Sequence, residues 1–461
     1  MSATTLIRGY KTRKFSPVEA TRAALDRIVA LNGIVNAYVF VDGEGAMRAA
    51  KASEARWLKG NPLGLADGVP ASVKELLLAK NWPIRRCSLA TPPRAISDED
   101  SPAVARLREG GAVLLGKTNS PEFGWKGTTD NLLFGATRNP WDISRTAGGS
   151  SGGAAAAAAL GMGALHLGTD GGGSIRIPAA FSGIFGMKPT FGRVPVYPLS
   201  KFGMTSHAGP MTRCVEDGAL LLDLLARPDI RDWYALPEPG ISFSEETGKG
   251  VKGLRIAFSP TLGFAQVDPE IALIVSDMAQ KFTELGVELE FVDRVMDDPT
   301  QVFRKIWATG CAHTLRAFPN SARASMDPEL VRLAKYGESL NHMDYMDADY
   351  ARGLLGGVMN RFHEKYDLLI TPAEPIEAFD ITKQVDRPDQ RDWIDWTPFT
   401  YPFNLTGQPA ASIPCGFTKA GLPVGLQIVG RRYEDDVVLR ACYALESTQM
   451  GKMPALLENH R

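Results

Sequence analysis

Residues 148–189 read GGSSGGAAAAAALGMGALHLGTDGGGSIRIPAAFSGIFGMKP, and this stretch decides how the whole chain is interpreted. Glycine is destabilising inside helices and strands, so its density here marks backbone that bends sharply or approaches a ligand. Two serine-containing loops, residues 148–153 and 168–176, are separated by an alanine-rich run. The run 153–168 predicts a close-packed internal helix, which is too short and too weakly hydrophobic to span a bilayer.

The second serine loop has the composition of an oxyanion hole. Three successive glycines precede Ser174, so consecutive backbone N–H groups can converge on one point. Ser174 also lies where the next helix is expected to start, at the positive end of its dipole. A flexible linker is the alternative, but the apolar runs 154–160 and 175–185 favour an ordered site. The expected oxyanion donors are the backbone N–H groups of Gly171, Gly172, Gly173 and Ser174.

Outside this stretch, helix and strand patterns alternate along the chain. A capping box at residues 16–19 predicts one helix, and Ser101-Pro102 begins another that Gly110 ends. Pro269 begins a third helix, in which apolar residues recur with helical periodicity up to Gly286. This interleaving predicts an α/β chain that forms one large domain. The predicted strands are the apolar runs 112–115, 256–258, 287–292, 368–370 and 426–429.

The composition is that of an ordinary globular domain, because 44% of the residues are hydrophobic and 22% are charged. The formal net charge of −1 provides no drive toward nucleic acid or an anionic membrane. The five cysteines are scattered and form no C-x-x-C pair, which disfavours a disulfide framework and a thiolate zinc site. No secretory signal is apparent at the N-terminus, so a reducing cytoplasm is the expected location.

Residues 111–118 satisfy the P-loop spelling G-x-x-x-x-G-K-[ST], with Lys117 at the lysine position. A P-loop needs a strand before its first glycine and a helix after its last residue. Here residues 112–115 are themselves the predicted strand, and Ser120-Pro121 follows. Nucleotide binding is therefore the weaker interpretation of this segment.

Residues 148–152 also spell G-x-S-x-G, the nucleophile elbow of α/β-hydrolases, with Ser150 at its centre. An elbow follows an apolar strand, whereas residues 144–147 are small and polar, and no downstream histidine stands out as a partner. The context therefore disfavours a serine-histidine hydrolase.

The motifs from residue 148 onward resemble the amidase signature family, whose hallmark is G-G-S-S-G-G, an alanine-rich run, G-T-D-x-G-G-S-I-R-x-P-A and G-x-K-P-T-x-G-R-V-P. The resemblance implies an α/β amidase signature fold, with a large mixed central β-sheet covered on both faces by helices. It implies a single domain of residues 1–461, with the signature core at about 65–215 and a variable substrate-pocket region at about 295–405. The matching segments are 68–74, 116–119, 137–142, 168–179, 188–195, 209–213, 404–410, 412–414 and 421–427.

The resemblance also implies which residues carry the chemistry. Members of the family hydrolyse a C–N acyl bond with a Ser-Ser-Lys triad, in which the bridging serine follows a cis peptide bond. The matching positions are Ser174 as the nucleophile, Ser150 as the bridging serine and Lys74 as the base. Neither a metal nor a cofactor is implied.

Lys74 must lose its usual charge to act as a base. A lysine with the reference pKa of about 10.4 is protonated at neutral pH and cannot accept a proton. Apolar neighbours such as Val73 and Leu76 favour a pKa lowered by desolvation. Around the triad, we expect Ser151, Asp170 and Arg176 to orient the loops, and Glu75 and Gly171 stand where relatives often have Asp and Thr.

Aromatic residues in the variable parts of the chain suggest an apolar or aryl substrate. We expect small amides, with esters or carbamates (urethanes) as further substrates, because one acyl-enzyme can form with release of an amine or an alcohol. The glutamine-hydrolysing component of a glutamyl-tRNA amidotransferase is the alternative, but residues 319–379 show no recognisable glutamine pocket. The expected partner is a small molecule, without nucleic acid or membrane, and the expected state is a monomer or homodimer. Pocket candidates are Phe123, Trp125, Trp307, Phe399 and Tyr401, while Phe303, Trp393 and Trp396 are further aromatics of which several fill core.

Overall fold

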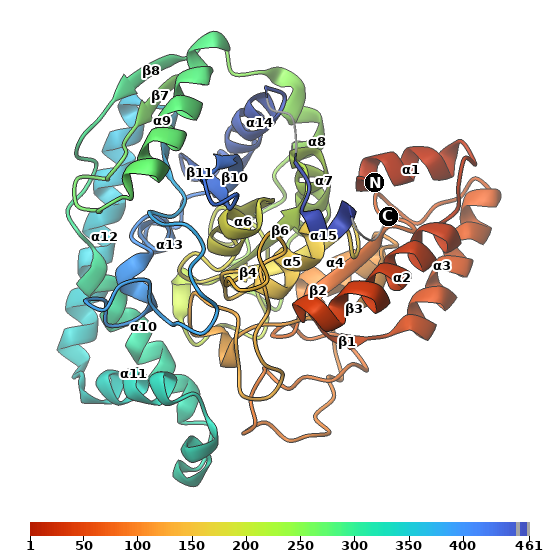
Figure 1. Ribbon diagram of the computed structural model, residues 1–461, viewed down its shortest axis with the longest axis horizontal. Helices are drawn as coiled ribbons and strands as arrows, with labels where there is room; N and C mark the ends of the chain where they lie inside the picture. Colours follow the sequence, from red (N-terminus) through yellow and green to blue (C-terminus); the bar gives the residue numbers. More distant parts are fainter. Residues whose placement is uncertain (449–451, 459–461) are drawn as a thin grey trace.

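The computed structural model describes residues 1–448 and 452–458, and its strands form one sheet of 11 strands. The strand order is β1-β3-β2-β4-β6-β5-β10-β11-β9-β7-β8, and Figure 1 shows the sheet running from β1 at the lower right to β8 at the upper left. The strands are β1 (Tyr38–Val41), β2 (Pro70–Lys74), β3 (Val113–Thr118), β4 (Leu165–Asp170), β5 (Phe185–Lys188), β6 (His207–Thr212), β7 (Arg255–Phe258), β8 (Glu288–Phe291), β9 (Leu368–Pro372), β10 (Ala410–Phe417) and β11 (Pro423–Gly430).

Strand direction changes several times across the sheet. β2 pairs in parallel with β3 and β4, and β7 pairs in parallel with β8 and β9, whereas the other pairs are antiparallel. Val73 of β2 lies opposite Leu167 of β4, so the C-terminal ends of these two strands meet at the same edge of the sheet. The large mixed α/β sheet predicted from the sequence is confirmed.

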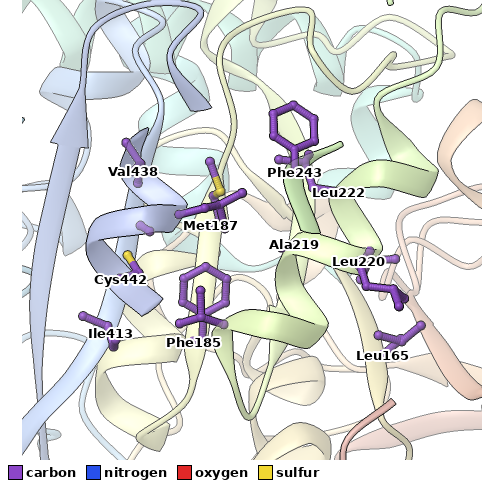
Figure 2. Packing of buried hydrophobic residues seen from close by; sticks show 14 of the residues in the cluster. Leu165, Phe185, Met187, Ala219, Leu220, Leu222, Phe243, Ile413, Val438 and Cys442 are labelled. Carbon is purple, nitrogen blue, oxygen red and sulfur yellow. The ribbon is translucent and has the colours of Figure 1, made fainter. Parts of the chain in front are cut away.

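Helices cover both faces of the sheet. On one face, Leu165 of β4 and Phe185 of β5 pack with side chains of α7 and α14, as Figure 2 shows. On the other face, Met211 of β6 packs with α5 and α6. The helices are α1 (Ala3–Lys11), α2 (Pro17–Val35), α3 (Gly43–Leu58), α4 (Pro102–Glu109), α5 (Gly152–Ala159), α6 (Arg176–Ser182), α7 (Val215–Leu225), α8 (Phe243–Glu246), α9 (Pro269–Glu284), α10 (Thr300–Leu315), α11 (Pro328–Ser339), α12 (His342–Lys365), α13 (Pro402–Leu405), α14 (Asp435–Glu446) and α15 (Ala455–Glu458).

The helix starts predicted from capping signals are confirmed. Ser16 accepts a hydrogen bond from the Glu19 backbone, and the Glu19 side chain accepts one from the Ser16 backbone, so the capping box before α2 is complete. α4 and α9 begin at the predicted prolines, and Gly110 caps α4. The five predicted strands are all present, as β3, β7, β8, β9 and β11.

The predicted helix over 153–168 is wrong in its second half. α5 ends at Ala159, and residues 165–170 form the buried strand β4. Gly161 and Gly163 separate the two elements with φ values of 64° and 128°, which a continuous helix cannot contain. His166 therefore belongs to strand β4, and its ring Nδ1 lies 2.8 Å from the Ser72 hydroxyl oxygen of β2.

A helical region formed by α10, α11 and α12 lies beside the sheet, at the lower left and left of Figure 1. α10 carries Trp307 toward the loop that follows β4, where a Cβ added to Gly171 would lie 2.9 Å from the indole ring. This approach places the helical region over the glycine-rich loop. Within residues 1–448 and 452–458, no helix combines the length and the apolar character needed to cross a membrane.

Candidate active site

Lys74 occupies the last position of β2, and its side chain is completely buried. The parallel strand β4 ends next to it, so the loop after β4 begins beside the lysine. The Lys74 Nζ atom lies 2.6 Å from Ser150 Oγ, 2.9 Å from Ser151 Oγ and 2.9 Å from Thr169 Oγ1. The structure thus brings the predicted base and the predicted bridging serine into direct contact.

Burial lowers the pKa of Lys74 to about 7, because removal from water penalises the charged ammonium. The Cys87 and Asp170 side chains oppose this lowering of the pKa, but they do not outweigh it. A lysine in this environment exists in part as the neutral amine near neutral pH, which is the form that can accept a proton.

Ser174 lies close to the first serine loop. The Ser151 backbone N–H donates to the Ser174 carbonyl oxygen over 3.1 Å, and Ser150 and Ser174 both line one cavity. The Gly149–Ser150 peptide bond is cis, as the resemblance implied. In the described ranges, no hydrogen bond joins the Ser150 and Ser174 hydroxyls directly. The arrangement joins Lys74 to Ser150 and places Ser174 beside them at the cavity surface.

The glycine loop supplies fewer free donors than predicted. The Gly173 N–H donates to Asp170 Oδ1 over 2.8 Å, so Gly173 is not available to an oxyanion and its predicted role is wrong. The N–H groups of Gly171, Gly172 and Ser174 donate to no group in the described chain. Gly173 still needs to be glycine, because its φ is 128° and an added Cβ would lie 2.3 Å from Thr400 Oγ1.

The Asp170 and Arg176 side chains form a completely buried ion pair beneath this loop. The two Arg176 donors lie 3.0 and 2.9 Å from the carboxylate oxygens, and Asp170 also accepts from the Gly173 and Ile175 backbone. Burial would raise the pKa of Asp170, but Arg176 and Asn404 hold it below its usual value. These contacts fix the loop on both sides of Ser174, which is the placement that a loop-orienting role requires.

Other parts of this network had not been predicted. Asn404 donates to Asp170 Oδ1 over 2.8 Å and accepts from Arg176 Nη2 over 2.6 Å, and Gln427 accepts from Arg176 Nη1 over 2.8 Å. Thr169 was not predicted as a partner of Lys74 either. Asn404 and Gln427 lie in segments that match the family motifs, but nothing local in the sequence indicates which buried ion pair they serve.

A cavity of about 320 Å³ opens above Ser174. We call Ser150, Thr169, Asp170, Gly171 and Ser174, with Lys74 beneath them, the floor of the cavity. The wall is mainly apolar and comprises Leu76, Arg86, Phe123, Tyr197, Leu199, Phe202, Trp307 and Phe318, among others. Phe123 and Trp307 had been predicted as pocket residues, whereas Tyr197, Phe202 and Phe318 had not.

Three predicted pocket residues lie elsewhere, so their assignment is wrong. Tyr401 stacks on Phe303 with ring centroids 4.7 Å apart and shares a hydrogen bond with Thr300. The Trp125 indole N–H donates to Asp327 over 3.3 Å. Phe399 is completely buried in a separate apolar cluster. All three side chains fill core between elements that are distant in sequence.

Known proteins resemble this chain over most of its length. The Amidase family model matches residues 19–439. The chain belongs to the amidase family. It is 37% identical to an acylamidase of Rhodococcus erythropolis, over 99% of this chain and 97% of that protein. It is also 37% identical to the A chain of the glutamyl-tRNA(Gln) amidotransferase of Moorella thermoacetica, over 95% of this chain and 94% of that protein.

The solved structure of a bacterial aryl acylamidase of the amidase signature family superimposes on this amidase with a TM-score of 0.93. The two sequences are 31% identical, and the match covers 100% of this chain and 99% of the other. The family resemblance and the fold are therefore confirmed, and the protein is an amide-hydrolysing enzyme.

The P-loop interpretation finds no support in this amidase. Lys117 belongs to strand β3, is buried, and donates to the Pro83 carbonyl oxygen over 2.8 Å. Its Nζ lies 3.9 Å from Glu75 Oε1. The residues of the motif are thus a sheet strand and not a loop that could surround a phosphate.

In the described part of the chain, no group of three or more His, Cys, Asp or Glu side chains could hold a metal ion.

Proposed function

We propose that this amidase hydrolyses small amides with aryl or hydrophobic groups through a Lys74–Ser150–Ser174 acyl-enzyme mechanism. The observation that carries the proposal is the contact of 2.6 Å between Ser150 and a completely buried lysine whose pKa is lowered to about 7. Such a lysine is suited to accept a proton from a hydroxyl group next to the reacting serine.

The contacts of Lys74 orient its lone pair. The Ser151 hydroxyl donates to the Thr169 carbonyl oxygen over 3.1 Å, so toward Lys74 it can only accept. A neutral amine has two N–H groups, and it can donate one hydrogen bond to Ser151 Oγ and one to Thr169 Oγ1. The lone pair is then left for the Ser150 hydroxyl. In our proposal, Lys74 takes the Ser150 proton while Ser150 takes the Ser174 proton.

The activated Ser174 oxygen then attacks the acyl carbonyl carbon, and a tetrahedral oxyanion forms. The N–H groups of Gly171, Gly172 and Ser174 are the donors proposed to stabilise it. Collapse breaks the C–N bond, and the proton held by Lys74 returns through Ser150 to the leaving amine. Water attacks the resulting ester by the same relay, which releases the acid and restores Ser174.

The wall of the cavity supports aryl or hydrophobic substrates. Trp307 stacks on Phe202 with ring centroids 3.9 Å apart, and Phe318 lies 5.3 Å from Phe123. Aromatic walls of this kind favour planar apolar groups. Esters and carbamates fit the same proposal, because a departing alcohol also needs the proton that Lys74 returns through Ser150.

We further propose that the enzyme is cytoplasmic and acts as a monomer or homodimer without nucleic acid.

A fluorophosphonate probe tests the proposed nucleophile. We expect one covalent adduct per chain, located on Ser174 by peptide mass spectrometry, and no adduct in Ser174→Ala. The same variant should lose hydrolysis of acetanilide while keeping the wild-type circular dichroism spectrum. Ser150 and Ser206 also line the cavity. An adduct on either of them, or acetanilide hydrolysis that survives in Ser174→Ala, would overturn the assignment.

A glutaminase of the tRNA amidotransferase type is the second candidate, because one component of such an enzyme is 37% identical to this chain. The comparison of glutamine with acetanilide as substrates separates the two. A kcat/KM for ammonia release from glutamine that exceeds the value for acetanilide would favour the tRNA enzyme over our proposal.

A further inference from the structure

The cavity of the amidase carries positive charge that is not balanced within the cavity. Its charged lining residues are Arg86, Lys201 and Asp170. The Asp170 carboxylate is already paired with Arg176 over 2.9 Å, so it cannot neutralise the other two. Burial lowers the pKa of His207, which also lines the cavity, well below its usual value and keeps it uncharged. Two cationic residues, Arg86 and Lys201, therefore line the cavity without a free counter-ion among its lining residues.

The backbone of Arg86 is held firmly at the wall. Its N–H donates to Glu75 Oε1 over 3.0 Å, and its carbonyl oxygen accepts from the Phe123 N–H over 2.9 Å. The side chain is partly buried, and its guanidinium donates no hydrogen bond and forms no ion pair within residues 1–448 and 452–458. Arg86 is thus fixed at its base and unpartnered at its charged end.

Glu75 is the acidic residue that could form an ion pair with the Arg86 guanidinium, but its carboxylate is bound by other groups. It accepts from the backbone N–H groups of Arg85 and Arg86 over 2.6 and 3.0 Å, and it lies 3.9 Å from Lys117 Nζ. Burial lowers the pKa of Arg86, and the Glu75 charge opposes this lowering without outweighing it. Glu75 therefore acts on Arg86 only at a distance.

Other buried arginines of this chain show what Arg86 lacks. Arg176 contacts Asp170 through two nitrogens, and Arg304 contacts both Asp392 and Asp395. A guanidinium removed from water without an anion is unfavourable, and a carboxylate recovers that free energy through two parallel hydrogen bonds. An unpaired, partly buried arginine in a substrate cavity is thus a site for an anion.

We infer that Arg86 forms a carboxylate subsite, so the substrate is an amide that carries a carboxylate group away from the scissile bond. This inference rests on the proposed function. Phe123, whose N–H donates to the Arg86 carbonyl oxygen, and Leu76 line the same cavity, which favours an apolar or aryl spacer between the amide and the carboxylate. Lys201, at the exposed side of the cavity, attracts the anion during entry.

Two matched pairs of anilides test the subsite. Glutaranilic acid and 5-methylhexananilide differ by a carboxylate against an isopropyl group on the acyl side. 4-Acetamidobenzoate and 4-isopropylacetanilide differ in the same way on the amine side. We expect the wild-type kcat/KM to favour the carboxylate member at least about tenfold in one pair. In Arg86→Gln, this selectivity ratio should fall by about 10- to 100-fold.

Arg85→Gln is the matched control, because Arg85 is the neighbouring arginine, does not line the cavity and donates to the Ser88 carbonyl oxygen over 3.4 Å. Its selectivity ratio should stay within about twofold of the wild type. Arg86→Lys keeps the charge without the two-pronged geometry, and its ratio should fall between those of the wild type and Arg86→Gln. It serves as the test if Arg86→Gln does not fold.

A wild-type enzyme without selectivity in either pair, an unchanged ratio in the folded Arg86 variants, or an equal fall in Arg85→Gln would overturn the carboxylate subsite. The proposed function would survive each of these results, because hydrolysis of the neutral anilides and labelling of Ser174 measure it separately. Loss of both the neutral hydrolysis and the Ser174 label would instead refute the proposed function.

Discussion

At the floor of the cavity, Lys74 and Asp170 are completely buried and each has at least three hydrogen-bond partners. On the wall, the guanidinium of Arg86 has none within the described chain, and the aromatic rings contact mainly one another. Both regions face the same cavity of about 320 Å³. Groups with complete sets of internal partners are fixed by the protein, whereas groups without partners are left to a ligand.

This difference separates the reaction from its selectivity. The floor holds Lys74 Nζ in contact with Ser150 Oγ over 2.6 Å, which is the pre-organisation that the first step of the proposed relay needs. The wall comes from distant elements, since Phe123 follows β3, Phe202 precedes β6, and Trp307 lies on α10. Changes to the floor should therefore abolish turnover, and changes to the wall should alter which amide is preferred.

The largest expected effect comes from Lys74→Met, which removes the base from the floor. We expect kcat for acetanilide to fall by about 10²- to 10⁴-fold, because general-base catalysis by the relay is lost. The measurement is steady-state hydrolysis at pH 8 by protein whose folding is verified by circular dichroism.

The other buried lysine provides the control. In Lys117→Met, the Pro83 carbonyl oxygen and Glu75 lose their partner, so the free energy of unfolding should decrease. Within the described residues, the Lys117 side chain has no hydrogen bond or ion pair with the floor, so kcat of the folded protein should stay within about tenfold of the wild type. Equal losses of kcat in the two variants would contradict the assignment of Lys74 as the base.

The pH profile should show the next largest effect. Burial lowers the pKa of Lys74 to about 7, and the proposed active form is the neutral amine. Activity is then nearly complete above this pKa and decreases as the pH falls through it, by about tenfold per pH unit well below pH 7. The measurement is kcat/KM for a neutral anilide between pH 5 and 9, so that no substrate charge titrates.

Fluorescence and circular dichroism measured at each pH are the control, because they show whether the protein stays folded across this range. A flat profile down to pH 5.5 would contradict a desolvated base at the floor. So would activity that still rises about tenfold per pH unit up to pH 9, as expected for a base with the ordinary lysine pKa of about 10.4.

Most of the floor could be predicted from the sequence, and most of the wall could not. Lys74, Ser150 and Ser174 are predicted because they stand in motifs that resemble those of the amidase signature family, and the glycine-rich loops around the two serines have local backbone demands. The engagement of Gly173 by Asp170 was missed, because glycine runs do not show which N–H group an adjacent carboxylate will accept from. The predicted helix over 153–168 was too long for a similar reason. The alanine run favours a helix, whereas Gly161 and Gly163 after it adopt positive φ values that end it.

The residues of the wall were not predicted correctly, for a different physical reason. Trp125 and Trp307 are both buried aromatic residues, with 2% of the surface of each exposed, and only tertiary packing decides that Trp307 lines the cavity. In the same way, Arg85 and Arg86 are adjacent in sequence, yet within residues 1–448 and 452–458 only the Arg85 side chain has a hydrogen bond. Such distinctions depend on contacts between residues far apart along the chain, which one sequence does not display.

The smallest expected effect concerns the wall and distinguishes it from the core behind it. Trp307→Leu removes the ring that stacks on Phe202, so kcat/KM for acetanilide should fall by about two- to tenfold. The value for acetamide, which has no ring to stack, should fall less. Tyr401→Phe is the control, because it removes only a hydroxyl group that bonds Thr300 outside the cavity, and it should change the ratio of the two substrates by less than about twofold. A ratio that shifts equally in both variants, or not at all in Trp307→Leu, would show that the aromatic wall does not contribute to substrate selection.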